Sequence, residues 1–380
     1  MSSYLDTPPP PSESTNQSTM TNLANLSQDF HVNSNGKISE VLNFPTSEIF
    51  YRKFVSKSVP LKITRGLTSR QPCNYQSSGG EEEVISFSPK LSSLEDISSL
   101  LGEEFITVNV TPGGFGDALI VDEENDELVF VTPEERRMTF KELVENFRDG
   151  KDDIVNSDDG NTIPIKYPDP VFYYSQQDNN LQDFCEVQRL SELLPKTLPF
   201  AENAFATGKP QAINFWVGDG RATTTMHRDV FENMYVVLKG IKVFILVPPY
   251  LGGCLYEDSF RKGSWKQNEK SNKFEIVYED DKDLEEDKVK WVSVDVENDI
   301  HKTEKYPMLK HVKPIRVEVC EGETLYLPAM WYHKVYSVGT TIAVNYWYDM
   351  EYDGLNWMFH NFACGVGEEE CKRKEENTKL

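Results

Sequence analysis

The chain has 380 residues, of which 38% are hydrophobic and 12% aromatic, so it can build one large domain or two small ones. Its formal net charge of −23 argues against nonspecific nucleic-acid binding, which requires cationic patches, and favours cationic partners wherever the charge does more than confer solubility. No apolar run approaches the roughly 20 residues of a membrane span, and six scattered cysteines without a CxxC pair predict a reduced compartment, the cytosol or the nucleus.

The first 40 residues are predicted to form a disordered tail, because they are rich in Ser, Thr, Asn and Pro. They contain neither the basic segment nor the apolar segment of a secretory signal. We expect one folded domain at residues 41–365, made of a helix-and-strand part at 41–170 and a barrel at 171–350. A second disordered tail is expected at residues 366–380.

The N-terminal part of this domain is predicted to contain helices and strands. Capping residues, helical spacing and terminating glycines mark the helices. The last helix also has a capping box formed by Thr139 and Glu142. A strand that begins at Pro60 is placed at a sheet edge, because proline has no N–H to donate to a neighbouring strand. The expected elements are helices from Thr46 or Ser47 to about Val55, Ser93 to Leu101 and Thr139 to Arg148 (ended by Gly150), and strands Pro60 to Gly66 and Phe105 to Val110.

The second half is predicted to be rich in short strands separated by Gly or Pro turns. Leu238 to Lys242 is interpreted as a tight connection between two antiparallel strands, and the charged stretch at about 257–311 as a surface insertion outside the core. The predicted fold is therefore mostly β with flanking helices, built on a double-stranded β-helix of the jelly-roll (cupin) type. The expected strands are Ile213 to Val217, Met234 to Leu238, Lys242 to Val247, Glu323 to Leu327 and Thr341 to Tyr348.

His227 and Asp229 lie two positions apart, and His333 follows much later in Leu-Pro-Ala-Met-Trp-Tyr-His. Side chains at i and i+2 of a strand point the same way, so His227 and Asp229 can reach one metal ion together. Two histidines and one carboxylate on one face of a six-coordinate Fe(II) leave three positions open, the arrangement of non-haem iron oxygenases. These three residues are the predicted metal ligands and catalytic centre.

The open positions can take a bidentate 2-oxo acid and dioxygen. A 2-oxoglutarate co-substrate has a second carboxylate, which Lys242 can hold as a point charge and Thr224 can contact through its hydroxyl. Asn233 and Asn345 lie in mostly apolar strands, where an amide must find partners. Both are candidates for orienting the iron ligands or the oxo acid.

Each of these features alone has a more common explanation. A single His-x-Asp often occurs by chance, Lys242 alone is more often a solvated strand residue, and Asn345 alone is more often a satisfied core amide. Their joint occurrence favours a metal site.

The motif residues of this chain resemble those of jumonji-C oxygenases of the cupin type. The resembling segments are Thr224–Asp229, Glu232–Tyr235, Gly240–Lys242, Val247–Pro249, Gly322–Pro328, Trp331–His333 and Ala343–Tyr348. Within that family the chain is similar to small lysyl hydroxylases, in a likeness that covers about residues 45–360. That similarity rests on Val110–Phe115, Pro133–Arg137, Ala212–Trp216 and Tyr348–Asp353.

The resemblance implies specific roles. The residues implied are His227, Asp229 and His333 for Fe(II), and Thr224, Lys242 and Tyr173 for 2-oxoglutarate, with Asn233 and Asn345 nearby. The implied reaction is C-3 hydroxylation of a lysyl residue in a translation-associated, developmentally regulated GTP-binding protein, with succinate and carbon dioxide as co-products. Related asparaginyl hydroxylases dimerise through C-terminal helices, which makes Asn356 to Cys364 a candidate homodimer segment.

Three other functions remain open. The same iron chemistry can remove a methyl group from N-methyl-lysine, as in histone demethylases. A jumonji-type peptidase would use a metal-bound water to attack an amide. A binding module with a relict metal site is disfavoured, because a relict has no chemical need for intact ligands and Lys242.

Overall fold

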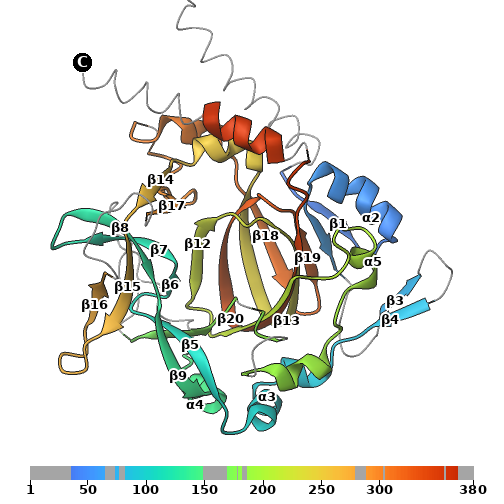
Figure 1. Cartoon of the computed structure of the whole chain (residues 1–380), viewed down its shortest axis with the longest axis horizontal. Coiled ribbons are helices and arrows are strands. Elements are labelled where there is room, and N and C mark those ends of the chain that lie inside the picture. The colour runs from blue at the N-terminus through green and yellow to red at the C-terminus, as the bar shows by residue number, and fades with distance from the viewer. Residues whose placement is uncertain are drawn as a thin grey trace, which may run out of the picture.

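Two long strands form the centre of the structure (Figure 1). β13 (Phe231–Val247) and β20 (Tyr332–Asp349) pair antiparallel along their length. The first half of β13 and the second half of β20 belong to one sheet, and their other halves belong to a second sheet. The two strands therefore join both walls of a barrel, which confirms the predicted jelly-roll fold.

The computed structural model describes residues 36–64, 73–76, 82–148, 169–177, 179–181, 186–278, 288–302, 304–354 and 357–366. The predicted tails thus lie outside the described residues, apart from residues 36–40 and residue 366. The larger sheet adds β1 (Ser39–Val41), β2 (Leu61–Ile63), β5 (Phe105–Thr111), β9 (Glu134–Thr139), β10 (Val171–Tyr174), β11 (Ala212–Gly218) and β19 (Thr324–Leu327). The smaller sheet adds β6 (Phe115–Gly116), β12 (Thr223–His227) and β18 (Ile315–Cys320).

The register of the β13–β20 pair changes by one residue around Gly240. Val237 lies opposite Ala343, whereas Lys242 lies opposite Ser337. Gly240 has a φ of 78°, in the left-handed region that glycine enters without strain. Because strand side chains alternate between faces, a bulge of one residue transfers every later side chain to the opposite face. Lys242 therefore faces the barrel interior.

The predicted tight connection at 238–242 is wrong, because β13 continues through it as one bulged strand. A glycine between two β-segments is compatible with either structure, and pairing with β20 on both sides of Gly240 selects the strand. The strand expected at Thr341–Tyr348 is likewise the second half of β20. Asn345 and His333 therefore share one strand and do not lie on successive strands.

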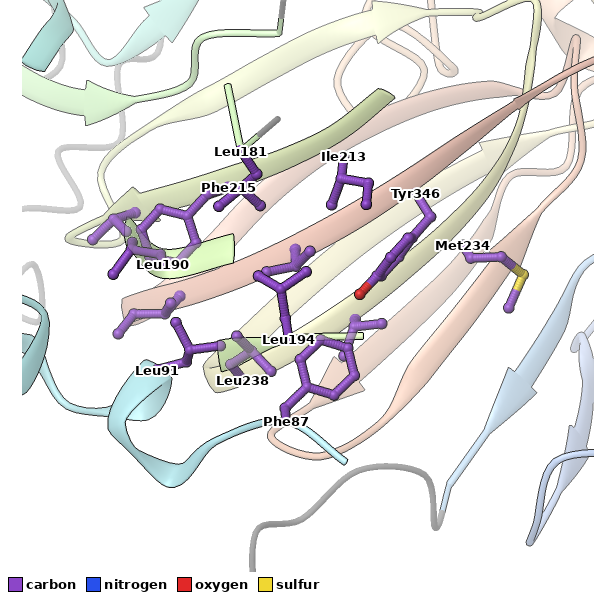
Figure 2. Close-up of a cluster of buried hydrophobic side chains, with 14 of the residues drawn as sticks. Phe87, Leu91, Leu181, Leu190, Leu194, Ile213, Phe215, Met234, Leu238 and Tyr346 are labelled. Atoms are coloured by element: carbon purple, nitrogen blue, oxygen red, sulfur yellow. The ribbon is translucent and has the colours of Figure 1, made fainter. Parts of the chain in front are cut away.

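Hydrophobic side chains pack on both faces of the larger sheet. The inner faces of the two sheets fill the barrel with residues that include Phe244, Leu325 and Ala343. The outer face of the larger sheet packs against helices, and Figure 2 shows part of that cluster, where Phe215 and Tyr346 meet side chains from outside the sheet. The helices are α2 (Ser47–Lys53), α3 (Leu94–Leu101), α4 (Phe140–Glu145) and α5 (Pro199–Glu202).

The helix starts follow the predicted caps, but one predicted end does not. The Thr46 and Ser93 hydroxyls accept N–H groups of α2 and α3, and Thr139 and Glu142 form the expected capping box of α4. α4 ends at Glu145 and does not reach Arg148. The Arg148 main-chain N–H donates to the Asp219 carboxylate at 2.9 Å and not to a carbonyl of the helix. Gly150 lies outside the described residues.

The strand after Pro60 is not at the sheet edge. β2 pairs with β19 on one side and with β1 in parallel on the other. β1 (Ser39–Val41) supplies this outer neighbour from the border of the segment predicted as a tail. The proline is still accommodated, because Pro60 precedes β2 (Leu61–Ile63) and takes no place in its ladder.

The segment at 257–311 was expected to lie on the surface, and this is wrong for much of it. Val292, Val294 and Met308 are buried and pack on the outer face of the smaller sheet with residues of β13. Apolar residues alternate at Val292, Val294 and Val296 and explain this packing, since they give the segment one hydrophobic face. Its strands are β14 (Glu257–Phe260), β15 (Lys262–Gln267), β16 (Phe274–Val277) and β17 (Val289–Val292).

Residues 357–366 form a C-terminal helical segment, and further short elements complete the described chain. They are strands β3 (Cys73–Gln76), β4 (Glu82–Ile85), β7 (Ala118–Asp122) and β8 (Glu127–Thr132), and 3₁₀ helices at Val55–Lys57, Pro89–Ser92, Gln188–Leu193, Pro249–Cys254 and Pro307–His311. In the described part of the chain, no helix combines the length and apolar content needed to cross a membrane.

Gly240→Ala is expected to destabilise the protein more than Gly339→Ala does. Both glycines have positive φ, so either alanine costs roughly 1 kcal/mol of unfolding free energy. At Gly240 the new Cβ would also collide with the Thr340 carbonyl, adding ~1–3 kcal/mol, whereas nothing lies within 4 Å at Gly339. Urea unfolding of both variants measures the difference, and equal losses would contradict the assigned bulge.

Candidate metal centre

His227, Asp229 and His333 come together at one end of the barrel. His227 ends β12 and lies opposite His333 of β20. The Asp229 carboxylate is 3.9 Å from His227 Nε2 and 3.5 Å from His333 Nε2, and one ligand atom from each residue lies within 4.8 Å of the others. The three predicted ligands are therefore grouped as the motif requires.

Asp229 reaches this position from outside the strand. β12 stops at His227, so the strand alternation used to place Asp229 from the sequence does not apply. The Met330 N–H donates to the Asp229 carbonyl at 2.8 Å, and Met330 itself has a φ of 68°. The loop before His333 thus fixes the loop that carries Asp229.

Both imidazoles turn Nε2 toward the centre of the group. Nδ1 of His227 is 2.7 Å from the Thr225 carbonyl, and Nδ1 of His333 is 2.9 Å from the Trp331 carbonyl. A carbonyl only accepts, so each Nδ1 carries the proton and each Nε2 keeps its lone pair. Burial also lowers the pKa of His333 to about 4, which keeps this ring neutral at physiological pH.

This donor set fits a divalent transition metal. Two imidazole nitrogens and one carboxylate oxygen suit Fe(II) and leave half of an octahedron for other ligands. Within the described ranges, no other group of three His, Cys, Asp or Glu side chains comes close enough to hold an ion. The grouping therefore marks the candidate metal centre of the described chain.

Lys242 lies deeper in the barrel and is 2% exposed. Its Nζ donates to the Tyr173 hydroxyl at 3.1 Å and lies 4.9 Å from the centre of that ring. Burial lowers the pKa of Lys242 to about 7, and no carboxylate of the described residues pairs with it. A buried ammonium whose hydrogen-bond partner is the Tyr173 hydroxyl is suited to bind an anionic ligand.

The metal group and the ammonium face the same interior. On β13, Leu246 lies opposite His333, and Lys242 lies four residues before Leu246. Lys242 and His333 are therefore four residues apart along the direction of the strands. That spacing corresponds to about 13 Å along the strand.

The two predicted asparagines form one network with Trp216. The Trp216 indole N–H donates to Asn345 Oδ1 at 2.9 Å, and Asn345 Nδ2 donates to Asn233 Oδ1 at 3.3 Å. Asn345 is 1% exposed and Asn233 5%, so the network is part of the barrel interior. It holds the Trp216 ring beside Tyr173, with ring centres 6.1 Å apart.

A pocket lies beside the metal group, between β12 and the strands β5 and β10. Thr224 and Tyr173, predicted to contact the same co-substrate, both line it. The remaining lining residues are Asn109, Thr111, Gly114, Gly116, Asp117, Pro133, Val171, Ser175, Gln177, Trp216, Ala222 and Thr223. The pocket gives a ligand access to the hydroxyls of Thr224 and Tyr173.

Trp291 is a site residue that the sequence analysis missed. Its ring lies parallel to the His227 imidazole, at 5.7 Å between centres and 1° between planes. Its indole N–H donates to the Thr225 hydroxyl at 3.0 Å, and the Thr225 carbonyl holds His227. The available signal was the alternation around Trp291 in Val-Lys-Trp-Val-Ser-Val, which indicates a half-buried strand.

Comparisons with known proteins agree with this geometry. A family model described as "Cupin-like domain" matches residues 46–354. JmjC domain-containing protein E of Dictyostelium discoideum is 29% identical over 374 residues, which cover 94% of this chain and 96% of that protein. Bifunctional peptidase and (3S)-lysyl hydroxylase JMJD7 of Homo sapiens is 33% identical over 263 residues, covering 69% and 73%. Lysine-specific demethylase JMJ32 of Arabidopsis thaliana is 28% identical over 323 residues, covering 82% and 84%.

Trp291→Leu is expected to weaken divalent-metal binding by about tenfold, because the stacked ring and its hydrogen bond orient His227. Titration of the metal-free chain with Co(II), followed by its absorption spectrum, measures the affinity directly. Trp265→Leu is the matched control, since Trp265 is a buried tryptophan of β15 that packs with Val129 and Val131. Unchanged Co(II) affinity in Trp291→Leu would remove this residue from the metal centre.

Proposed function

Since this chain belongs to the cupin-like JmjC family, whose members are 2-oxoglutarate-dependent oxygenases, we propose that it is an Fe(II)- and 2-oxoglutarate-dependent protein lysyl hydroxylase. One observation carries the proposal. The metal group and the Lys242 ammonium, which no carboxylate of the described residues pairs with, face the same barrel interior, and a dicarboxylic oxo acid has one acid group to offer each of them. A plain metal-binding module has no need for that ammonium.

Different side chains of the barrel would bind the metal ion and the co-substrate. His227, Asp229 and His333 would hold Fe(II), which with 2-oxoglutarate supplies the power to activate dioxygen for attack on a C–H bond. Lys242 would pair with the far carboxylate of 2-oxoglutarate. Tyr173 accepts a hydrogen bond from Lys242 and keeps its own proton for the same carboxylate, because burial raises its pKa.

The proposed reaction balances without another reactant. One oxygen atom of O₂ enters the lysyl C–H bond as a hydroxyl, and the other enters succinate as 2-oxoglutarate loses carbon dioxide. The apolar rings of Trp216 and Phe244 help to exclude water from the interior, which limits side reactions. The Thr224 hydroxyl at the pocket wall is available to the co-substrate.

The lysyl specificity rests on similarity. The 33% identical human protein is named a (3S)-lysyl hydroxylase, and the subfamily resemblance points to a translation-associated, developmentally regulated GTP-binding protein as the target. The net charge of −23 supports a cationic target segment through long-range attraction. We therefore propose C-3 hydroxylation of a lysyl residue in such a protein.

Two rival activities have support among the relatives. The Arabidopsis relative is named a lysine-specific demethylase, and the human relative is also named a peptidase. Demethylation would remove one methyl group from the target lysine and release formaldehyde. Peptidase activity would cleave the target polypeptide without consuming 2-oxoglutarate. The masses of the products separate all three activities.

Purified protein with Fe(II), 2-oxoglutarate and O₂ is expected to add one oxygen atom to a lysyl residue of a cell-extract protein. His227→Ala and Asp229→Ala should each reduce this oxidation at least ~100-fold, because each removes a metal ligand. Peptide mass spectrometry locates the oxygen. Loss of a methyl group, or cleavage under nitrogen, would replace the proposal by one of its rivals.

Lys242→Met is expected to abolish co-substrate binding and to flatten the pH dependence of stability. The unfolded chain holds the Lys242 proton up to a pKa near 10.5 and the folded chain releases it at about 7. The unfolded state therefore binds more protons between these values, so the contribution of Lys242 to the unfolding free energy rises with pH, by about 1–2 kcal/mol from pH 7 to pH 9.

Urea unfolding at both pH values measures this rise, which Lys242→Met should lack. Thermal unfolding with Mn(II) and 2-oxoglutarate provides the second measurement: the wild type should gain stability from the co-substrate and the variant should not. Equal stabilisation of both proteins by 2-oxoglutarate would show that Lys242 does not hold it.

A further inference from the structure

Asp117 lies in the wall of the pocket beside the metal centre. It joins β6 to β7 and lines the pocket together with Thr224 and Tyr173. The neighbouring residue Gly116 pairs with Thr224, and the Thr225 hydroxyl donates to the Asp117 carbonyl at 2.6 Å. The φ of 47° at Asp117 is uncommon for a residue with a side chain. These contacts fix Asp117 at the pocket wall.

The Asp117 carboxylate is the one charged group of the pocket lining in the described chain. The residue is half-buried, and its hydrogen bonds within the described ranges go to its backbone, leaving the carboxylate without a direct partner there. Burial raises the pKa of Asp117, and this outweighs the opposite effect of His227 and the exposed Lys262. A shielded carboxylate without a direct partner is unfavourable until a cation pairs with it.

We propose that Asp117 binds the ammonium group of the target lysine in this pocket. The inference rests on the proposed lysyl hydroxylase function and names the residue that would select the substrate. The pairing of Gly116 with Thr224 and the bond from Thr225 to the Asp117 carbonyl place Asp117 beside the part of β12 that ends in His227. The rings of Trp216 and Tyr173 in the same lining offer apolar surface to the methylene chain of lysine.

The rest of the lining is compatible with a cationic guest. Asn109 donates to the Ser175 hydroxyl at 2.7 Å, and no Lys or Arg of the described residues lines the pocket to repel an ammonium. An unmodified ammonium has three N–H groups to donate to a carboxylate, whereas each methyl group removes one and a trimethylated ammonium has none. Asp117 would therefore bind unmethylated lysine in preference to trimethyl-lysine, which disfavours demethylation of trimethyl-lysine at this site.

Peptide binding tests the inference without any catalytic turnover. The full chain, loaded with Mn(II) and 2-oxoglutarate, is titrated with fluorescein-labelled degenerate hexapeptides that carry a fixed central lysine or norleucine, and anisotropy reports binding. Norleucine keeps the methylene chain and lacks the ammonium. The wild type should bind the lysine library at least ~10-fold more tightly, and Asp117→Asn should reduce that preference to less than ~2-fold.

Glu127→Gln is the matched control, because Glu127 is an exposed carboxylate of the β7–β8 hairpin that is not in the pocket lining. This variant should keep the lysine preference, whereas an equal loss in both variants would assign the preference to general acidity. Thermal unfolding confirms that Asp117→Asn is folded. Equal binding of both libraries by the wild type, or a preserved preference in Asp117→Asn, would overturn the inference.

The outcomes separate this inference from the proposed function. If Asp117 confers a lysine preference but no lysyl oxidation is found in cell extracts, the hydroxylase proposal fails and Asp117 remains a cation site. If lysyl oxidation is found but binding does not depend on Asp117, the hydroxylase proposal stands and this inference fails.

Discussion

The position of the Lys242 ammonium depends on a single change of register in β13. Before Gly240 the odd-numbered residues of β13 face the barrel interior, and after it the even-numbered residues do, while β20 keeps one alternation throughout. Without the bulge, Lys242 would point to the outer face of the smaller sheet, among the hydrophobic residues that cover it. One left-handed glycine therefore decides whether the Lys242 side chain and the metal group face the same barrel interior.

The barrel interior has an uneven distribution of charge. The Asp229 carboxylate and two imidazoles, of which buried His333 is neutral, lie at one end, and the Lys242 ammonium, which no carboxylate of the described residues pairs with, lies at the other. Electrostatics in a buried space are strong, so the proposed 2-oxoglutarate would be oriented with its oxo-acid end toward the three grouped side chains and its far carboxylate toward Lys242. The Trp216–Asn345–Asn233 network fixes the wall between the two ends, because each amide there has a partner.

Local chemistry made much of the fold and site predictable. A capping box is formed by two residues three positions apart in the sequence, so the box of Thr139 and Glu142 at the start of α4 could be predicted from the sequence alone. The grouping of His227, Asp229 and His333 could be predicted because two histidines and one carboxylate are the ligand set of one metal geometry. The bulge at Gly240 could not be predicted, since a turn and a bulge require the same residue and only the length of β20 distinguishes them. Trp291 and Asp117 are brought to the site by tertiary contacts between distant segments, and the acidic composition around Trp291 obscured its alternating apolar pattern.

If Lys242 holds 2-oxoglutarate as proposed, its buried ammonium also links the degradation of the protein to the supply of that acid. Desolvation of that group weakens the empty fold, and an anion that pairs with it binds the folded chain and not the unfolded one. Proteases act on opened chains, so the fraction of molecules lost to degradation falls as the anion becomes more abundant. Cellular levels of this protein would then follow the supply of the small acid that it consumes.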